Sequence, residues 1–291
     1  MTGVIAPSLM AHRVGPQALV QDGGRIGLLS LGVCGSGAMD RASAQLANRL
    51  VGNADGAAVI EALLGGLEME SVGDLWCAVT GTDAPVLVDG VPVGANTPVH
   101  LPAGSRIRVD APTRGMRAYL AVRGGIDVPA VLGSRSTDTL AGLGPSPIVA
   151  GDVLPVGPVD GHWSAIDIAP VPPAPAEGDL LRIDVQPGPR RDWLRSSDDL
   201  LTRIWTVGAR QDRIGIRLEG EPLALAVDHA LPSEGTVAGA IEVPPEGLPY
   251  VLMRDHPVTV GYPVVAVVEP RGIDLLAQAR PGCRVRFGLS R

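Results

Sequence analysis

Short runs of alternating apolar and polar residues fill positions 57–122, and turn residues interrupt them about every ten positions. This spacing is typical of a β-sandwich or barrel and not of βαβ units, in which longer helical segments separate the strands. In the run at 106–109, Ile107 and Val109 fall on one face of the expected strand and the two arginines on the other. We expect strands within residues 57–64, 67–71, 75–81, 85–90, 98–102, 106–111 and 117–124, with a tight hairpin over 85–93.

Three segments place their apolar residues at helical spacing instead. Residues 36–52 are predicted to form an amphipathic helix, with Ser36 as its N-cap and Gly52 as its end. Residues 190–205 carry an apolar stripe typical of a second helix, and residues 273–279 are expected to form a short third one.

The second half of the chain resumes the strand pattern after the proline-rich segment 169–176. Proline lacks a backbone N–H and cannot hold a strand ladder, so this segment is expected to be stiff, extended and a boundary. The halves share a weak outline, because LPAGSRIRV in the first resembles RPGCRVRF in the second. We therefore expect a mainly β protein with two domains of one architecture, residues 1–175 and 176–291, with an approximate boundary and with termini that could exchange between the two domains. Further strands are expected at 180–188, 264–268 and 284–289, and a proline-rich strand region is expected after residues 212–218, up to residue 246.

Composition narrows the function classes. The net charge is −7 and aromatic residues make up 3% of the chain. A nucleic-acid-binding protein needs a basic face and often aromatic platforms for the bases, so this class is not favoured. No run of about 18 apolar residues is present, and we expect no membrane partner.

The cysteines and the N-terminal residues bear on the compartment. Cys34, Cys77 and Cys283 are far apart and form no CxxC pair, so reduced, buried thiols are expected rather than disulfides or a zinc site. The first fifteen residues lack a charged start followed by a long apolar run, which is the signature of a secretory signal. We expect a cytoplasmic protein.

Residues 123–144, RGGIDVPAVLGSRSTDTLAGLG, concentrate the groups that bind anions. Serine and threonine hydroxyls, backbone N–H groups at glycines and arginine side chains all supply donors or positive charge. Two ordinary surface loops would have the same composition, because glycine, serine and aspartate are also what turns are made of. The same ambiguity holds for the DGG turn at 22–24, which is also typical of a hairpin.

Several motifs taken together resemble a known family. QDGGRIG, SGAMDRASAQLANRLVGN, RGGIDVPAVLGSRSTDTLAGLG, DRIGIRL and GYP occur in this order along the chain. They resemble the carboxyltransferase-domain family of the second allophanate-hydrolase subunit, over about residues 12–288. That family includes the C-type component of bacterial 5-oxoprolinase, the antagonist of a histidine-kinase inhibitor, and part of urea amidolyase.

The resemblance implies a fold and an activity. The fold is two cyclophilin-like β-barrel domains with a few short helices. The activity is the ATP-dependent opening of 5-oxoproline to glutamate, a hydrolase reaction on a cyclic amide. It implies a hetero-oligomer with a smaller partner subunit of the kinase-inhibitor or 5-oxoprolinase B type, and with a third, A-type subunit. ATP with Mg would be shared with these partners, and no biotin is expected on this chain, because it has no AMKM-like attachment segment.

The resemblance also singles out residues. Asp138 and His256 are the candidate catalytic bases, and Asp138 is alternatively a metal ligand. No dedicated metal site is expected. No GxxxxGK[ST] motif is present, so a P-loop would not hold the ATP. Expected substrate or anion contacts are Arg25, Arg123, Gly124, Gly125, Ser134, Arg135, Ser136, Thr137, Arg213, Glu242 and Tyr262.

Simpler interpretations remain for some of these residues. Arg135 could form an ion pair with a neighbouring carboxylate, and His256 could be a surface loop residue. The sequence also departs from the family pattern. Cys34-Gly35 replaces a proline, Glu242 replaces a glutamine, and DHPVTVGYP stands for DRQTTGGYP, with changes that include residues 256, 257 and 260. These departures bear on substrate identity more than on fold.

Two other functions stay open from the sequence. One is a non-catalytic antagonist of a histidine-kinase inhibitor, in which an exposed apolar edge such as Val264–Val268 would form the interface. The other is an allophanate hydrolase or urea carboxyltransferase subunit, which would need a separate biotin carrier.

Overall fold

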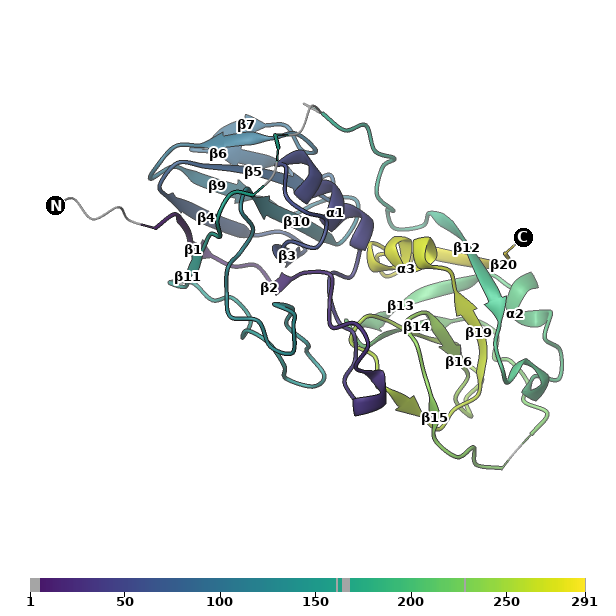
Figure 1. The fold of residues 1–291 in the computed structure, drawn as a ribbon. Coiled ribbons are helices and arrows are strands. Elements are labelled where there is room, and N and C mark those ends of the chain that lie inside the picture. Colours follow the sequence, from purple (N-terminus) through teal and green to yellow (C-terminus); the bar gives the residue numbers. More distant parts are fainter. Residues whose placement is uncertain (1–5, 161, 164–167, 228, 291) are drawn as a thin grey trace. The chain divides into compact units, whose positions relative to one another are not determined.

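The computed structural model describes residues 6–160, 162–163, 168–227 and 229–290 (Figure 1). The expected domain ends at residues 1 and 291 lie outside the described residues. The chain divides into two compact units. The first comprises Met1–Arg25, Asp40–Thr137 and Leu143–Ala174, and the second comprises Ile26–Met39, Asp138–Gly142 and Pro175–Arg291. Two short segments of the N-terminal part therefore belong to the second unit, which the sequence pattern did not predict. The expected boundary near residue 175 stays a prediction.

The first unit contains a six-stranded sheet and a five-stranded sheet, which share one hydrophobic core. The strand orders are β11-β1-β4-β9-β6-β7 and β2-β3-β10-β5-β8. The strands are β1 (Ser8–Arg13), β2 (Gln17–Gln21), β3 (Val59–Leu63), β4 (Leu67–Val72), β5 (Leu75–Thr80), β6 (Val86–Val88), β7 (Val91–Val93), β8 (Val99–Leu101), β9 (Arg106–Val109), β10 (Arg117–Val122) and β11 (Val153–Pro155). Core residues alternate along them, as Ile107 and Val109 do on β9, because successive side chains of a strand point to opposite faces.

The single α-helix of the described part of the first unit is α1 (Arg41–Leu50), which lies against β5 and β10. It begins later than the sequence pattern predicted. Asp40, not Ser36, is the N-cap, and its side chain accepts a hydrogen bond from the Ser43 N–H at 2.9 Å. A carboxylate at this position accepts a hydrogen bond from a free N–H of the first turn, and its negative charge interacts favourably with the positive end of the helix dipole.

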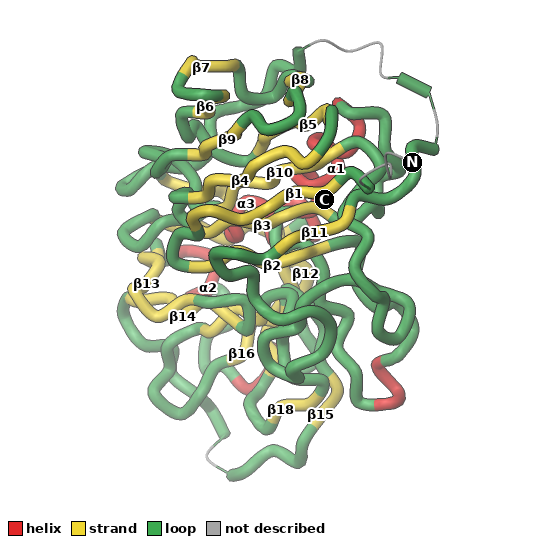
Figure 2. Tube along the Cα trace, turned by 90° about the vertical axis from the view of Figure 1, so that its left-hand side faces the viewer, coloured by secondary structure: helices red, strands yellow, loops and turns green. Residues whose placement is uncertain are grey.

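A closed seven-stranded barrel forms the second unit, in the order β12-β19-β16-β17-β14-β13-β20. The barrel strands are β12 (Leu180–Pro187), β13 (Trp205–Gln211), β14 (Gly215–Glu219), β16 (Ala240–Glu242), β17 (Tyr250–Leu252), β19 (Val264–Val268) and β20 (Arg284–Leu289). β12 and β20 are parallel, and they close the barrel. A separate two-stranded ribbon consists of β15 (Glu234–Gly235) and β18 (Thr259–Val260) (Figure 2).

The helices of the second unit are short. They are α2 (Asp199–Thr202), α3 (Pro270–Ala277) and the 3-10 turns η1 (Leu29–Leu31) and η2 (Arg191–Trp193). The short helix expected at 273–279 is confirmed. The helix expected over 190–205 is wrong, because only η2 and α2 form there and Trp205 already begins β13. Trp193 and Trp205 are both buried, and burial of these indoles outweighs the weak helical pattern.

The mainly β fold class with a few short helices is confirmed. The strands of the second unit close into a barrel, whereas the described sheets of the first unit are open. The three cysteines are buried and free, as expected. Val264–Val268 is confirmed as a strand, but β19 pairs with β12 on one side and β16 on the other. It therefore offers no free edge for a partner.

Candidate functional site

A buried ion pair between Arg213 and Asp255 lies just beyond the ends of β14 and β17 in the second unit. The guanidinium Nε and Nη2 donate to the two carboxylate oxygens of Asp255, both at 2.9 Å. The side chains are 2% and 0% exposed. Such a two-pronged arrangement fixes the orientation of both groups, because the planar guanidinium matches the carboxylate.

Asp255 also binds the two segments that join this unit from the N-terminal part of the chain. Ser36 Oγ donates to it at 2.7 Å, and the Thr139 N–H and hydroxyl each donate at 2.8 Å. Arg213 Nη2 donates to the Gly37 carbonyl at 2.6 Å. Burial alone would raise the pKa of Asp255, but the charge and hydrogen bonds of Arg213 outweigh it, and the pKa is lowered. Asp255 is therefore an ionised centre that holds both segments.

His256 follows Asp255 and is 3% exposed, so its interpretation as a surface residue is wrong. Its Nδ1 lies 2.8 Å from the Pro257 carbonyl oxygen. A carbonyl oxygen only accepts hydrogen bonds, so Nδ1 carries the proton and Nε2 is left with a lone pair. Burial lowers the pKa of His256, while Asp255 and Asp138 act against that effect. The imidazole is therefore neutral at neutral pH and can accept a proton.

Asp138 lies close enough to His256 for its charge to act on the imidazole. Its Oδ1 accepts the backbone N–H groups of Leu140 at 3.0 Å and Ala141 at 2.9 Å. Its Oδ2 is buried and has no hydrogen-bond partner among the described residues. A buried oxygen of this kind costs free energy unless a ligand or water satisfies it. The two candidate bases are therefore close enough to act on each other electrostatically.

Glu242 and Tyr262 are also in the second unit. Glu242 is the last residue of β16, opposite Val264, and Tyr262 precedes that valine by two residues. Glu242 is buried and Tyr262 is 43% exposed. The structure therefore brings these two predicted contacts to the same end of β16 and β19.

The serines predicted to bind an anion do so in the first unit, but the anion is a side chain of the chain itself. Ser134 Oγ and Ser136 Oγ each donate to Asp22 Oδ1 at 2.6 Å, and the Arg135 N–H donates to Asp22 Oδ2 at 2.6 Å. An external phosphate or carboxylate would have to replace Asp22. The assignment of these donors to such an anion stays a prediction.

Arg135 and Thr137 make further internal contacts. The Arg135 side chain pairs with Asp127 at 2.5 Å and donates to the Val128 carbonyl, so the simpler interpretation as an ion pair is confirmed. Thr137 Oγ1 donates to the Pro145 carbonyl at 2.9 Å. Both side chains therefore have structural partners in this state.

Arg25 stands out among the predicted anion contacts. It is 2% exposed, and its Nε and Nη2 donate to the Val131 and Ser136 carbonyls at 3.1 and 2.6 Å. Its Nη1 is buried without a hydrogen-bond partner in the described part of the chain. A buried guanidinium donor with no acceptor is a candidate contact for an anion.

Arg123 and the two glycines that follow it form a turn after β10. Arg123 Nη1 donates to the Val51 carbonyl at 2.8 Å, and its guanidinium lies 4.6 Å from the ring centre of Trp163. The Gly124 N–H donates to Asn53 Oδ1, and both glycines have positive φ. These contacts stabilise the turn, and a role in substrate binding stays a prediction.

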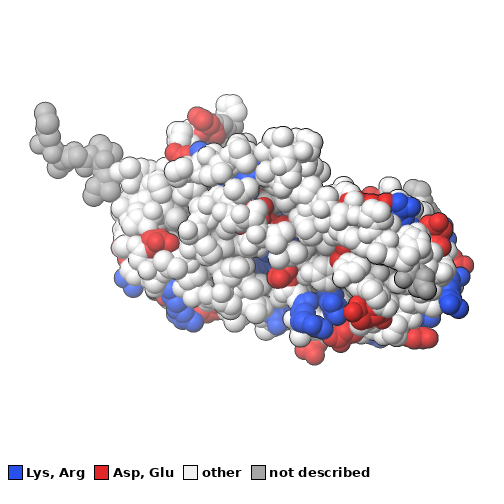
Figure 3. All heavy atoms as spheres, turned by 90° about the horizontal axis from the view of Figure 1, so that it is seen from below, with Lys and Arg blue, Asp and Glu red and all other residues white. Residues whose placement is uncertain are grey.

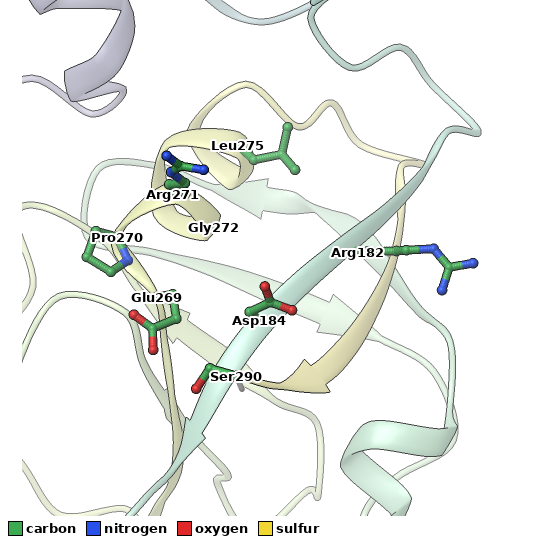
Figure 4. A pocket seen from close by; sticks show the side chains of 8 residues that line it. All are labelled: Arg182, Asp184, Glu269, Pro270, Arg271, Gly272, Leu275 and Ser290. Atoms are coloured by element: carbon green, nitrogen blue, oxygen red, sulfur yellow. The ribbon is translucent and has the colours of Figure 1, made fainter.

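Charged side chains and a hollow are found elsewhere on the described surface. In the view of Figure 3, acidic and basic side chains are interspersed over the right-hand part of the molecule. A hollow of about 600 Å³ lies between β12 and α3 and contains none of the predicted residues (Figure 4). Its lining combines Arg182, Asp184, Glu269, Pro270, Arg271, Gly272, Leu275 and Ser290. Across the described ranges, no cluster of three or more His, Cys, Asp or Glu side chains could hold a metal ion. Nor does any helix in them reach the length and apolarity that crossing a membrane takes.

Sequence reasoning missed Asp22 and Asp255 as the acceptors at the two sites. Asp22 lies inside QDGGRIG, which carries the family resemblance, and Asp255 begins DHPVTVGYP, the segment that ends in the GYP motif. A carboxylate next to a glycine turn or a histidine was the available signal. Its partners could not be read from spacing, because Asp255 lies 116 residues from Thr139.

Comparisons with known proteins agree on one family. The model of the carboxyltransferase domain, subdomain A and B, matches residues 31–289. The C-type component of the 5-oxoprolinase of Escherichia coli K12 is 37% identical over 283 residues, covering 94% of this chain and 89% of that protein.

Solved structures extend the likeness to larger proteins. The structure of TTHA0988 superposes with a TM-score of 0.87 at 34% identity, covering 97% of this chain. This chain spans 55% of the TTHA0988 chain, about half its length. The urea amidolyase of K. lactis gives a TM-score of 0.91 at 27% identity, and here the chain covers 19% of that protein.

Proposed function

The chain belongs to the family of carboxyltransferase domains with subdomains A and B, and from that premise we propose that it is the C-type component of a 5-oxoprolinase. The observation that carries the proposal is the extent of the match. Similarity to the Escherichia coli 5-oxoprolinase component covers 89% of that protein, whereas similarity to a yeast urea amidolyase covers 16%. A match over nearly the full length of both chains favours the same unit of function.

The reaction proposed is the ATP-dependent opening of 5-oxoproline. Water adds to the amide carbonyl, the C–N bond breaks, and glutamate forms. ATP hydrolysis to ADP and phosphate drives the opening. The chain would act with a smaller B-type subunit and a third, A-type subunit, in a hetero-oligomer. The expected cytoplasmic location stays a prediction.

His256 is the residue we assign to proton transfer. Neutral imidazole accepts the proton that the attacking water loses, and the same nitrogen can return it to the departing amide nitrogen. Asp138 and Asp255 both act electrostatically on His256. Their negative charges would stabilise the imidazolium that forms between the two transfers.

We assign no step to ATP in this chain. Ser134, Arg135 and Ser136, the donors best suited to phosphate, already bind Asp22. Among the predicted anion contacts, Arg25 provides a buried donor, Nη1, that has no hydrogen-bond partner within the described residues. If the nucleotide contacts this chain, Arg25 is the residue proposed to meet its phosphate or the substrate carboxylate.

A carboxyltransferase role is the second candidate. It is favoured by the TM-score of 0.91 to the K. lactis urea amidolyase, over 99% of this chain. It requires a separate biotin carrier, and its products differ from those of 5-oxoproline opening.

The test is glutamate formation by the reconstituted complex. His256→Gln should lower kcat at least about a hundredfold, the usual contribution of a general base. Asp138→Asn retains the Oδ1 acceptor for two N–H groups and removes the charge, so a smaller loss is expected. His229→Gln is the control, because this histidine is exposed in the same unit. Unchanged kcat in His256→Gln would contradict the assignment.

A further inference from the structure

The side chain of Glu242 is buried although it lies on the outside of the barrel. Its neighbour Ile241 belongs to the barrel core, and successive residues of a strand point to opposite faces. Glu242 is nevertheless 6% exposed, and its Oε2 is buried without a hydrogen-bond partner among the described residues. A carboxyl group in this position needs an explanation, because an unsatisfied buried oxygen is costly.

An apolar cluster occupies the strand positions next to Glu242 on the outer face of the barrel. It consists of Ala240, Leu252 and Val264, with Tyr250, Val260 and Val267 packed against it. Tyr250 and Val264 are the residues paired with Glu242 on the neighbouring strands. Val260 belongs to the β15–β18 ribbon. The buried Glu242 side chain therefore lies between Tyr250 on β17 and Val264 on β19, next to this apolar cluster.

Few charged groups face it. Tyr250 on β17 is the titratable neighbour, and Asp212 and Arg217, before and on β14, act on Tyr250 from its far side. The strands β18 and β19 carry no charged residue. Without a counter-charge, burial raises the pKa of Glu242 to about 7.

A carboxylic acid that keeps its proton presents an O–H donor and a C=O acceptor side by side. The amide of a small ring is held cis, so its C=O and N–H also lie side by side on one edge. The two groups match in two hydrogen bonds that close one ring. An open-chain amide is trans and presents the same groups on opposite sides.

Building on the proposed function, we propose that Glu242 binds the cis-amide edge of the cyclic substrate, donating its O–H to the amide carbonyl and accepting the amide N–H. The bond to the carbonyl oxygen would also favour attack by water, because negative charge develops on that oxygen. Tyr262, which is 43% exposed and two residues from Val264, lies at the same end of the strand. Glu242 thereby selects ring amides and makes their binding depend on pH.

The experiment measures affinity of the full chain, alone and in the reconstituted complex, for 2-pyrrolidinone and its N-methyl derivative. At about pH 6 the wild type should bind 2-pyrrolidinone at least about tenfold more tightly than at about pH 8.5, where the carboxylate has lost its donor. N-methylation should weaken binding at the lower pH. Glu242→Gln, which retains a donor and an acceptor, should bind equally at both pH values.

Two further readouts keep the outcome decisive. Infrared spectra at about pH 6 should show a protonated carboxyl band that is absent in Glu242→Gln and shifts when 2-pyrrolidinone binds. Glu246→Gln, at an exposed position nearby, is the control and should behave as wild type. Affinity that is equal at both pH values in the wild type, an unshifted band, or no lactam binding would each overturn the inference. The probes are lactam ligands, so failure of glutamate formation with intact, pH-dependent binding would overturn the proposed reaction alone.

Discussion

Replacing Glu242 by glutamine should change how the stability of the chain depends on pH. Burial raises the pKa of this carboxyl from the ordinary 4.5 to about 7. Each pH unit between these values is worth about 1.4 kcal/mol, so ionising Glu242 in the folded chain costs about 3 kcal/mol more than in the unfolded chain.

The sign follows from which state holds the proton. Between pH 4.5 and about 7 the folded chain retains the Glu242 proton, while the unfolded chain has lost it. Raising the pH through this window therefore lowers the free energy of unfolding, and the loss is complete above about pH 7. Glutamine does not titrate, so the free energy of unfolding of the variant, relative to that of the wild type, should rise by up to about 3 kcal/mol across this pH window.

The assay is urea denaturation followed by circular dichroism from about pH 5 to about pH 8.5. The quantity of interest is the difference in unfolding free energy between variant and wild type at each pH. Glu246→Gln, at an exposed position, is the control and should give a flat difference. A flat difference for Glu242→Gln as well would refute the reasoning, because it would mean that the carboxyl is not held neutral.

Two other substitutions test the packing of the second unit. Asp255→Asn leaves the Arg213 guanidinium buried without its counter-charge and should cost about 3–5 kcal/mol in denaturation experiments. Because the pKa of Asp255 is lowered, the wild type should also lose this stability as the pH falls below about 4, and the variant should not. If the free energy of unfolding fell equally in both proteins at acid pH, the account would be contradicted. Gly215→Ala places a methyl group 2.3 Å from the Tyr250 ring, so the substitution should destabilise the chain by about 1–3 kcal/mol. It should also alter the near-ultraviolet circular dichroism of the tyrosine. Unchanged spectra would show that the ring is not held there.

The strands could be predicted because alternation is a local signal. On β9, which lies between β4 and β6, Ile107 and Val109 are buried and Arg106 is exposed, as the pattern indicated. Helix limits were less accessible. Ser36 is a good N-cap residue by type, but it donates to Asp255 from a backbone with φ of 51°. A side chain 219 residues away determined its role.

The sequence predicted the chemical character of the site residues better than it predicted which residues they contact. The hydroxyls near Gly133 do bind a carboxylate, but Asp22 lies 112 residues from Ser134. The polar sequence before His256 is typical of a surface loop, whereas packing against Thr236 and the Pro257 carbonyl buries the imidazole. Residue type indicated what each group can do, and only the fold shows what it meets.

The account depends most on the substrate. The direct measurement is carbon-13 NMR of labelled 5-oxoproline incubated with ATP and the partner subunits, with and without this chain. We predict that labelled glutamate accumulates only when the chain and ATP are both present. The proposed function would be contradicted if glutamate formed equally without this chain. It would also be contradicted if no glutamate formed and the chain instead supported ATP-dependent carboxylation of urea with a biotin carrier.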